Sequence, residues 1–145
     1  MQDDAIQKIG DELEIRNLIA KLAAAADEGS AEEYAALFTE DAVWSMASVP
    51  GAAATFPPRT GRAEIVAGLV ERRADKGAGP GSHTRHGLFQ SIVDVSGDSA
   101  RARTYSAYYV QLDKSPMMQM FTIYQDGFIR TAEGWKLSSR QIEPA

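Results

Sequence analysis

The spacing of hydrophobic residues changes once along this chain, near residue 83, and this change limits the folds that it can adopt. Up to residue 74 the apolar residues recur about one helical turn apart, whereas from residue 83 onward they alternate with polar residues. A repeat near 3.6 residues predicts helices with one buried face, and a repeat of two predicts strands. Because the helices come first and the strands follow, we expect an α+β fold rather than alternating βαβ units.

Two helices are predicted before residue 40. The first covers residues 4–27, and Gly29 is well suited to a left-handed cap at its end. Ser30 and Glu33 have the spacing of a capping box. This spacing predicts a second helix that continues through Phe38.

A short strand over residues 42–46 and a Pro- and Gly-rich loop over 47–61 lead to a third helix, expected over 62–74. The rest of the chain is predicted to form four strands, because its alternating segments are separated by turn signals. These strands cover residues 83–95, 100–112, 117–130 and 135–143. No repeat or linker divides the chain, so we expect a single domain over residues 1–145.

Composition excludes several classes of function. The chain has 145 residues, a formal net charge of −5 and no cysteine. A negative chain repels a phosphate backbone, so nucleic acid is not expected as a partner. The lack of cysteine excludes disulfides and thiolate chemistry. The sequence has no secretory signal and no apolar window that could span a bilayer, so we expect a cytoplasmic location and no membrane partner.

No metal and no cofactor are expected. The two histidines, His83 and His86, fall on opposite faces of one predicted strand, and no third metal ligand accompanies them. The glycine-rich segment 77–81 follows a helix instead of a strand and lacks the Lys-Ser/Thr pair of a phosphate-binding loop.

The face of the 100–112 strand that points inward is indicated by its charges. Arg101 and Arg103 share one face and prefer water, so the opposite face should look into the fold. That inward face carries Ala100, Ala102, Thr104, Ser106 and Tyr108.

The 83–95 strand is less clear. Leu88 and Ile92 favour an inward face that also carries Thr84, His86 and Gln90. Phe89 and Val93 lie on the opposite face, so alternation alone leaves the choice open, and a bulge would reverse it.

With the first of these two faces inward, polar groups of several strands would line one concave side of the sheet. Small-molecule pockets combine apolar surface with a few polar groups in this way, whereas a plain interior seldom carries so many donors and acceptors. The expected lining is His86, Gln90, Ser106, Tyr108 and Thr122, with Trp44 and Met120 in the apolar wall.

Four segments, placed after a long helix that ends in Asp, carry a resemblance to a known family. They are 34-YAALFTEDAVW-44, 61-GRAEIVAGLVERR-73, 84-TRHGLFQSIVDVSGDSARA-102 and 134-GWKLSSRQIE-143. Their order resembles the SnoaL-like branch of the nuclear transport factor two-like superfamily. The resemblance implies a cone-shaped α+β barrel, in which three N-terminal helices pack on a curved, mostly antiparallel sheet that encloses a cavity.

The resemblance also implies a site. Family enzymes such as scytalone dehydratase, bile-acid dehydratase and hexachlorocyclohexane dehydrochlorinase use an Asp–His pair to abstract a proton as water or halide is lost. Asp27 and His86 match that pair, and Arg140 matches an arginine that assists the leaving group in some of them. Gln90 stands where relatives often carry Asn. The implied function is a small-molecule lyase that performs a dehydratase-type elimination on a cyclic, polyketide- or steroid-like substrate.

Other interpretations stay open. The same fold is compatible with a ring isomerase, or with a non-catalytic module for small-ligand binding or for association. Asp27 is equally compatible with a helix-end carboxylate in water, His86 with a satisfied core histidine, and Arg140 with a solvated charge. We expect His83 at the surface or at the rim of the cavity.

The outer face of the sheet and one loop carry two further expectations. An open sheet with Tyr105, Ala107 and Tyr109 on its outer face favours a partner sheet, so we expect a homodimer or homotrimer. The loop over 47–60, with Phe56, is a candidate lid for the cavity. Its apolar character favours a small hydrophobic molecule as the ligand.

Overall fold

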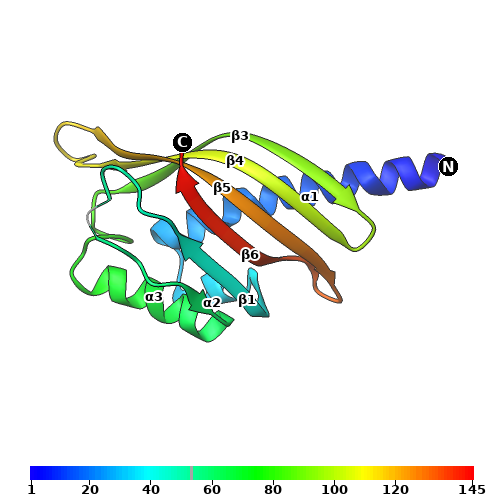
Figure 1. Ribbon diagram of the computed structural model, residues 1–145, viewed down its shortest axis with the longest axis horizontal. Helices are drawn as coiled ribbons and strands as arrows, with labels where there is room; N and C mark the ends of the chain where they lie inside the picture. Colours follow the sequence, from blue (N-terminus) through cyan, green and yellow to red (C-terminus); the bar gives the residue numbers. More distant parts are fainter. Residues whose placement is uncertain (53) are drawn as a thin grey trace.

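A computed structural model describes residues 1–52 and 54–145. Three helices and six strands follow one another in these residues (Figure 1). Their bounds are α1 Gln2–Glu28, α2 Ala31–Ala35, β1 Phe38–Met46, β2 Arg59–Thr60, α3 Arg62–Ala74, β3 Arg85–Ser96, β4 Ser99–Val110, β5 Met117–Thr131 and β6 Gly134–Pro144. The predicted α+β class is confirmed.

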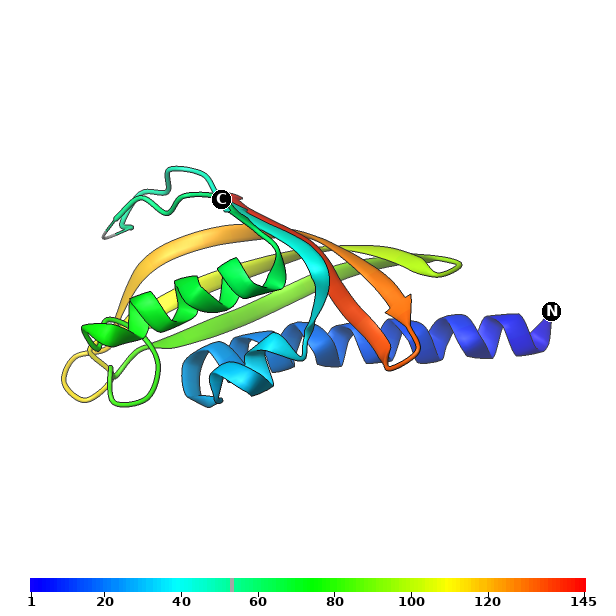
Figure 2. The same ribbon diagram turned by 90° about the horizontal axis from the view of Figure 1, so that it is seen from below.

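The six strands form one curved sheet in the order β2-β1-β6-β5-β4-β3. Neighbouring strands run antiparallel, except that β1 and β6 are parallel. The sheet does not close into a barrel, because β2 and β3 are free edges. Instead α1 packs along β3 and α3 packs against β1, so that the helices cover the concave side and complete the cone (Figure 2).

The hydrophobic core fills one end of this cone. Ile15, Leu18 and Ile19 of α1 are buried there against Phe128 and Leu137 of the sheet. The first turns of α1 run past the edge of the sheet, as Figure 2 shows. The early apolar side chains of the helix are therefore exposed, at Ile6, Ile9 and Leu13.

The second helix is shorter than its sequence predicts. The capping box is present, since the Glu33 N–H donates to Ser30 Oγ at 3.0 Å and the Ser30 N–H donates to Glu33 Oε2 at 2.8 Å. However, α2 ends at Ala35, and Phe38 begins β1. The Leu137 N–H donates to the Leu37 carbonyl at 2.9 Å, so pairing with β6 draws this segment into the sheet.

The predicted left-handed cap at Gly29 is wrong. Gly29 has φ −83° and ψ 172°, which is an extended conformation. The last carbonyls of α1 are satisfied instead by Arg73 of α3. A tertiary contact therefore replaces the local signal at this helix end.

A bulge in β3 reverses the face that its side chains occupy. Leu88 pairs with Ser106 but Ser91 pairs with Thr104, so one extra residue is inserted between these pairs. Beyond the bulge the inward residues are Val93 and Val95, packed on the core. The inward placement of Ile92 is wrong, since its side chain is 67% exposed. The same shift turns Gln90 outward.

The side-chain directions predicted for β4 agree with the structure better than those predicted for β3. Ala100, Ala102, Thr104 and Ser106 are all buried, as expected for the inward face. On the outer face Ala107 is also buried, contrary to the expectation of an exposed side chain. It pairs with Phe121 and stands between two tyrosines of its own strand.

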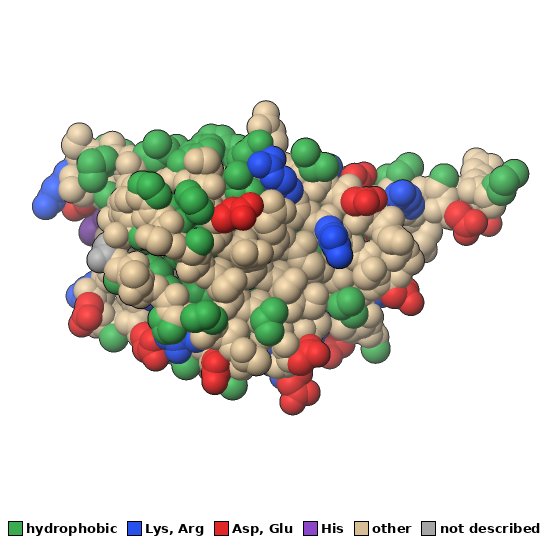
Figure 3. Space-filling model, viewed as in Figure 1, with side chains coloured by type: hydrophobic (Ala, Val, Ile, Leu, Met, Phe, Trp, Pro, Cys, Tyr) green, Lys and Arg blue, Asp and Glu red, His purple; other side chains and the backbone are tan. Residues whose placement is uncertain are grey.

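The outer face of the sheet carries an aromatic cluster, here called the outer aromatic patch, which consists of Phe89, Tyr105 and Phe121. The Phe121 ring lies 5.6 Å from Phe89 and 6.2 Å from Tyr105, measured between centroids. Phe89 is 52% exposed and Phe121 37%. In Figure 3 hydrophobic side chains gather over the left-hand end of the sheet.

In the part of the chain that the structure describes, no helix is both long and apolar enough to cross a membrane.

Candidate active site

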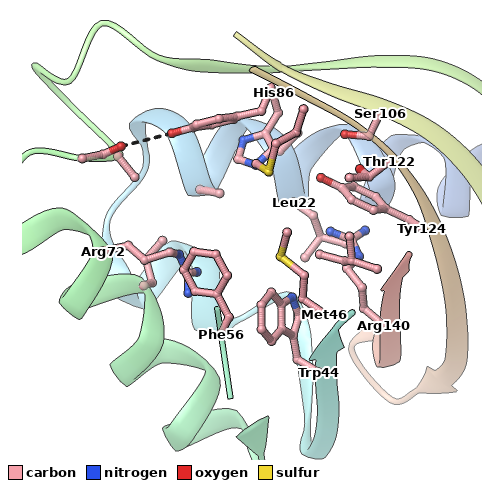
Figure 4. Close-up of a pocket in the computed structure, with 18 of the residues that line it drawn as sticks. Leu22, Trp44, Met46, Phe56, Arg72, His86, Ser106, Thr122, Tyr124 and Arg140 are labelled. Atoms are coloured by element: carbon pink, nitrogen blue, oxygen red, sulfur yellow. Dashed lines mark hydrogen bonds between the residues drawn. The ribbon is translucent and has the colours of Figure 1, made fainter. Parts of the chain in front are cut away.

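A cavity of about 420 Å³ lies between the concave face of the sheet and the helices (Figure 4). Its size falls within the range of small-molecule sites. Much of the wall is apolar, with Leu22, Trp44, Met46, Phe56, Leu69 and Ile142. Polar groups project into it from α2, α3 and four strands, namely Tyr34, Arg72, His86, Ser106, Tyr108, Thr122, Tyr124 and Arg140.

The structure brings Asp27 and His86 together at one end of this cavity. Asp27, in the last turn of α1, is 5% exposed. Its Oδ1 lies 2.7 Å from His86 Nδ1, and its Oδ2 accepts the main-chain N–H of His86 at 2.8 Å. Because an ionised carboxylate only accepts hydrogen bonds, the proton of the neutral ring belongs on Nδ1. Nε2 is then the basic nitrogen.

Arg73 of α3 lowers the electrostatic cost of burying the Asp27 carboxylate. A carboxylate at the C-terminal end of a helix meets the negative end of the helix dipole. The Arg73 guanidinium donates to the Gly29 carbonyl at 2.8 Å and to the carbonyls of Ala25 and Ala26 at 2.9 Å. This cation therefore both caps α1 and offsets the dipole beside Asp27.

Tyr108 of β4 packs on the other side of the imidazole. Its ring lies 4.9 Å from the His86 ring, between centroids, at a tilt of 55°. Its hydroxyl donates to Thr84 Oγ1 at 2.8 Å. Burial raises the pKa of the Tyr108 phenol, with the Thr84 hydrogen bond acting against it. The phenol is therefore a neutral group that holds the imidazole in place.

Arg140 of β6 faces the cavity with its charge already paired. Nε and Nη2 each donate to the Asp126 carboxylate at 2.8 Å, and the guanidinium lies 4.1 Å from the centre of the Tyr124 ring. Burial acts to lower the pKa of Arg140, but the Asp126 carboxylate outweighs it and holds that pKa above its ordinary value. The Arg140–Asp126 pair therefore presents a fixed hydrogen-bond donor with little net charge.

Of the other residues that the sequence indicates for the site, five line the cavity and one does not. The five are Trp44, Ser106, Tyr108, Met120 and Thr122. Gln90 is exposed on the outer side of β3, because it falls within the bulge between Leu88 and Ser91. Its assignment to the lining is wrong. His83 is at the surface, as expected, with 56% of its side chain exposed and Asp113 at 3.9 Å.

Sequence reasoning missed several cavity residues that periodicity could have found. Arg72 lies one turn after the buried Leu69 of α3. Tyr124 follows Thr122 at a step of two in β5 and lines the cavity, and Asp126, buried at the next step, binds the cavity residue Arg140. Burial raises the pKa of the Tyr124 phenol, which lines the cavity as a neutral group.

Ala53, within the candidate lid over residues 47–60, lies outside the described residues. Ala54 and Phe56 of this segment do line the cavity. The Phe56 ring stands edge-on to Trp44, with the centroids 6.4 Å apart. Among the described residues, no three His, Asp or Glu side chains are placed to hold a metal ion.

An open curved sheet with helices covering its concave side defines the class of nuclear transport factor two-like folds. The chain belongs to the SnoaL-like domain family, whose sequence profile matches residues 7–141. A search of curated proteins finds none that matches the chain.

Solved structures agree with this assignment. An NTF2-like protein with a cystatin-like fold from Novosphingobium aromaticivorans is 27% identical, with a TM-score of 0.82 over 99% of this chain and 87% of that one. A candidate aromatic ring hydroxylase from the same organism is also 27% identical, with a TM-score of 0.72 over 93% and 89% of the two chains. A candidate scytalone dehydratase from that organism is 20% identical, with a TM-score of 0.71 over 98% and 87%, and shares the fold.

Proposed function

We propose that this protein is a small-molecule lyase that removes a carbon-bound proton from a ligand held in the cavity and expels water from it. The observation that carries the proposal is the buried Asp27 carboxylate, which binds both the ring and the main chain of His86. A carboxylate in this position fixes the tautomer of the imidazole and stabilises the imidazolium formed when the ring takes a proton.

The chemistry follows from the orientation of the ring. His86 Nε2 accepts the proton from carbon, and the electrons of that C–H bond form a double bond as the hydroxyl group departs from the adjacent carbon. The imidazolium then returns the proton to the departing oxygen, which leaves as water. A general base of this kind contributes about 10²–10⁴-fold to the rate.

One group on the cavity wall, the Arg140 guanidinium, supports the departure of the hydroxyl. Arg140 is held by Asp126 through Nε and Nη2, so Nη1 remains to donate towards the ligand. A donor fixed before the reaction stabilises developing negative charge without reorganisation. The name of one structural relative, a candidate scytalone dehydratase, agrees in reaction type.

A ring isomerase is the second candidate. It would use the same base, but the imidazolium would return the proton to a different carbon. The partly open position of His86, with 26% of its side chain exposed, allows the ring to serve either carbon of a flat ligand. Dehydration is distinguished from isomerisation by a product that has lost the mass of one water.

The test is a screen of cyclic hydroxylated and carbonyl compounds in deuterated water, followed by mass spectrometry and proton NMR. His86→Ala and Asp27→Asn should lose product formation. Deuterium that appears at a carbon of the product indicates isomerisation, because the elimination returns the proton to the departing oxygen and adds none to carbon. His83→Gln is the matched control, because His83 is exposed and outside the cavity. Wild-type rates in both site variants would reject the enzyme, and ligand binding without turnover by the wild type would favour a non-catalytic module.

A further inference from the structure

Arg72 reaches into the cavity from α3, on the side away from Arg140 in the view of Figure 4. It belongs to the buried stripe of α3, since Ile65 and Leu69 precede it on the same face. Its guanidinium lies 5.7 Å from the centre of the Trp44 ring. A charged side chain is thus placed beside an aromatic wall, within a largely apolar hollow.

The charge of Arg72 is not balanced by a neighbouring acid. The ion pairs formed among residues 1–52 and 54–145 do not include Arg72. Burial is the largest cause of the lowered pKa of its guanidinium, and the opposing effect of nearby groups, Glu71 included, does not offset it. Arg140 differs, because Asp126 holds it in two hydrogen bonds.

The acidic groups that border the cavity do not form an ion pair with Arg72 among the described residues. Glu71 and Asp75 also border the cavity, but both are exposed, and Glu71 is bound to Arg59 at 2.6 Å. Asp27 is directed at His86. Within the cavity, Arg72 is therefore a cation that lacks an anion of its own.

We infer that the cavity takes a flat aromatic carboxylic acid, whose carboxylate binds Arg72 while its ring packs against Trp44 and Phe56. The inference rests on the proposed small-molecule site and adds the charge of its ligand. One unbalanced cation calls for one negative charge. The planar fork of a guanidinium matches a carboxylate in two parallel hydrogen bonds, and the apolar remainder of the wall suits an aromatic ring.

We expect the cavity to bind a negatively charged ligand more tightly than a neutral ligand of the same shape. Hydrogen bonds to a charged group contribute enough to change affinity about tenfold to a hundredfold. The probes are 2-naphthoate and its neutral analogue 2-naphthamide, each titrated calorimetrically into the full-length protein. Wild-type protein should bind the naphthoate at least about tenfold more tightly.

Arg72→Met should remove that preference by weakening naphthoate binding about tenfold to a hundredfold while leaving naphthamide unchanged. Arg62→Met is the matched control, because Arg62 begins the same helix and does not line the cavity. Circular dichroism and thermal unfolding check that each variant is folded. The imidazole NMR signals locate the ligand, because binding in the cavity shifts the signal of His86 and leaves that of exposed His83 unchanged.

Three results would overturn the inference. They are equal affinity of the wild type for both probes, no measurable binding of either probe, and equal weakening of both in Arg72→Met. Repeating the titrations with His86→Ala separates it from the proposed reaction. If that variant keeps the preference for naphthoate while the wild type shows no turnover of any compound, the lyase proposal fails and the ligand assignment stands. If the wild type instead turns over neutral compounds only, the lyase proposal stands and the ligand assignment fails.

Discussion

Asp27 binds His86 at two atoms, the ring Nδ1 and the main-chain N–H, although 59 residues separate them in sequence. One carboxylate thereby fixes the position of the strand and the orientation of the ring. The end of α1 and the start of β3 are consequently held at the distance that the imidazole requires.

Replacing Asp27 by Asn should alter the tautomer of His86. An amide offers one acceptor oxygen instead of two carboxylate oxygens, and its NH₂ group can donate to Nδ1. We expect ¹⁵N NMR to show the proton on Nδ1 in the wild type and a mixture of tautomers in Asp27→Asn. His83 serves as an internal reference in the same spectra. An unchanged His86 tautomer in the variant would contradict the role given to Asp27.

Arg73 should act on His86 through the end of α1. Arg73→Met removes the donors to three carbonyls and leaves them partly buried, which should lower the free energy of unfolding by about 1–3 kcal/mol. It should also broaden or split the ¹⁵N signals of the His86 ring, because Arg73 no longer fixes the end of α1 that carries Asp27. Arg73→Lys should recover part of the stability but less of the ring signal, since one ammonium cannot reach all three carbonyls. A loss of stability with a wild-type ring signal would leave Arg73 with a structural role alone.

Asp11 should make stability depend on pH in the acid range. Arg130 hydrogen bonds, together with those from Trp135 and Gln7, hold the pKa of the Asp11 carboxyl well below its usual range. A group whose pKa is lower in the folded state stabilises the protein above its unfolded pKa, and that contribution disappears as pH falls through the folded value. The difference in unfolding free energy between wild type and Asp11→Asn should therefore shrink as pH falls below about 4. Asp98→Asn is the control, because Asp98 contacts the same arginine but is 85% exposed.

The outer aromatic patch should mediate self-association. A surface with Phe89, Phe121 and the nearby Ile92 exposed is one that a second sheet can cover. We expect sedimentation velocity to show a homodimer or homotrimer for the wild type and a monomer for Phe89→Glu combined with Ile92→Lys. Val70→Lys, on the exposed side of α3, should leave the assembly unchanged. A wild-type protein that sediments as a monomer at high concentration would contradict this prediction.

The fold could be predicted from periodicity wherever one local pattern acted alone. The helices at residues 62–74 and 4–27 and the four long strands fall close to their predicted positions. The errors arose where a distant segment competed with a local preference. Pairing with β6 takes Phe38 from the second helix, and Arg73 replaces the cap at Gly29. Neither partner is adjacent in sequence.

The site could be predicted in part. The resemblance pairs Asp27 with His86, and the structure shows these two side chains in hydrogen-bond contact; alternation finds the lining residues of β4. The prediction that Gln90 lines the cavity is wrong because the alternation of residues before a bulge does not reveal the bulge. Asp126 and Arg72 were overlooked because each is a charged residue on an inward face, where composition alone predicts solvent exposure. Only the structure shows that one is paired and the other faces a hollow.

The bulge in β3 also separates two parts of one strand. Before it, His86 lines the cavity; after it, Val93 and Val95 point into the packed interior. Substitutions in β3 before residues 89–90 should therefore alter the lining of the cavity, whereas the core residues beyond the bulge stay unchanged.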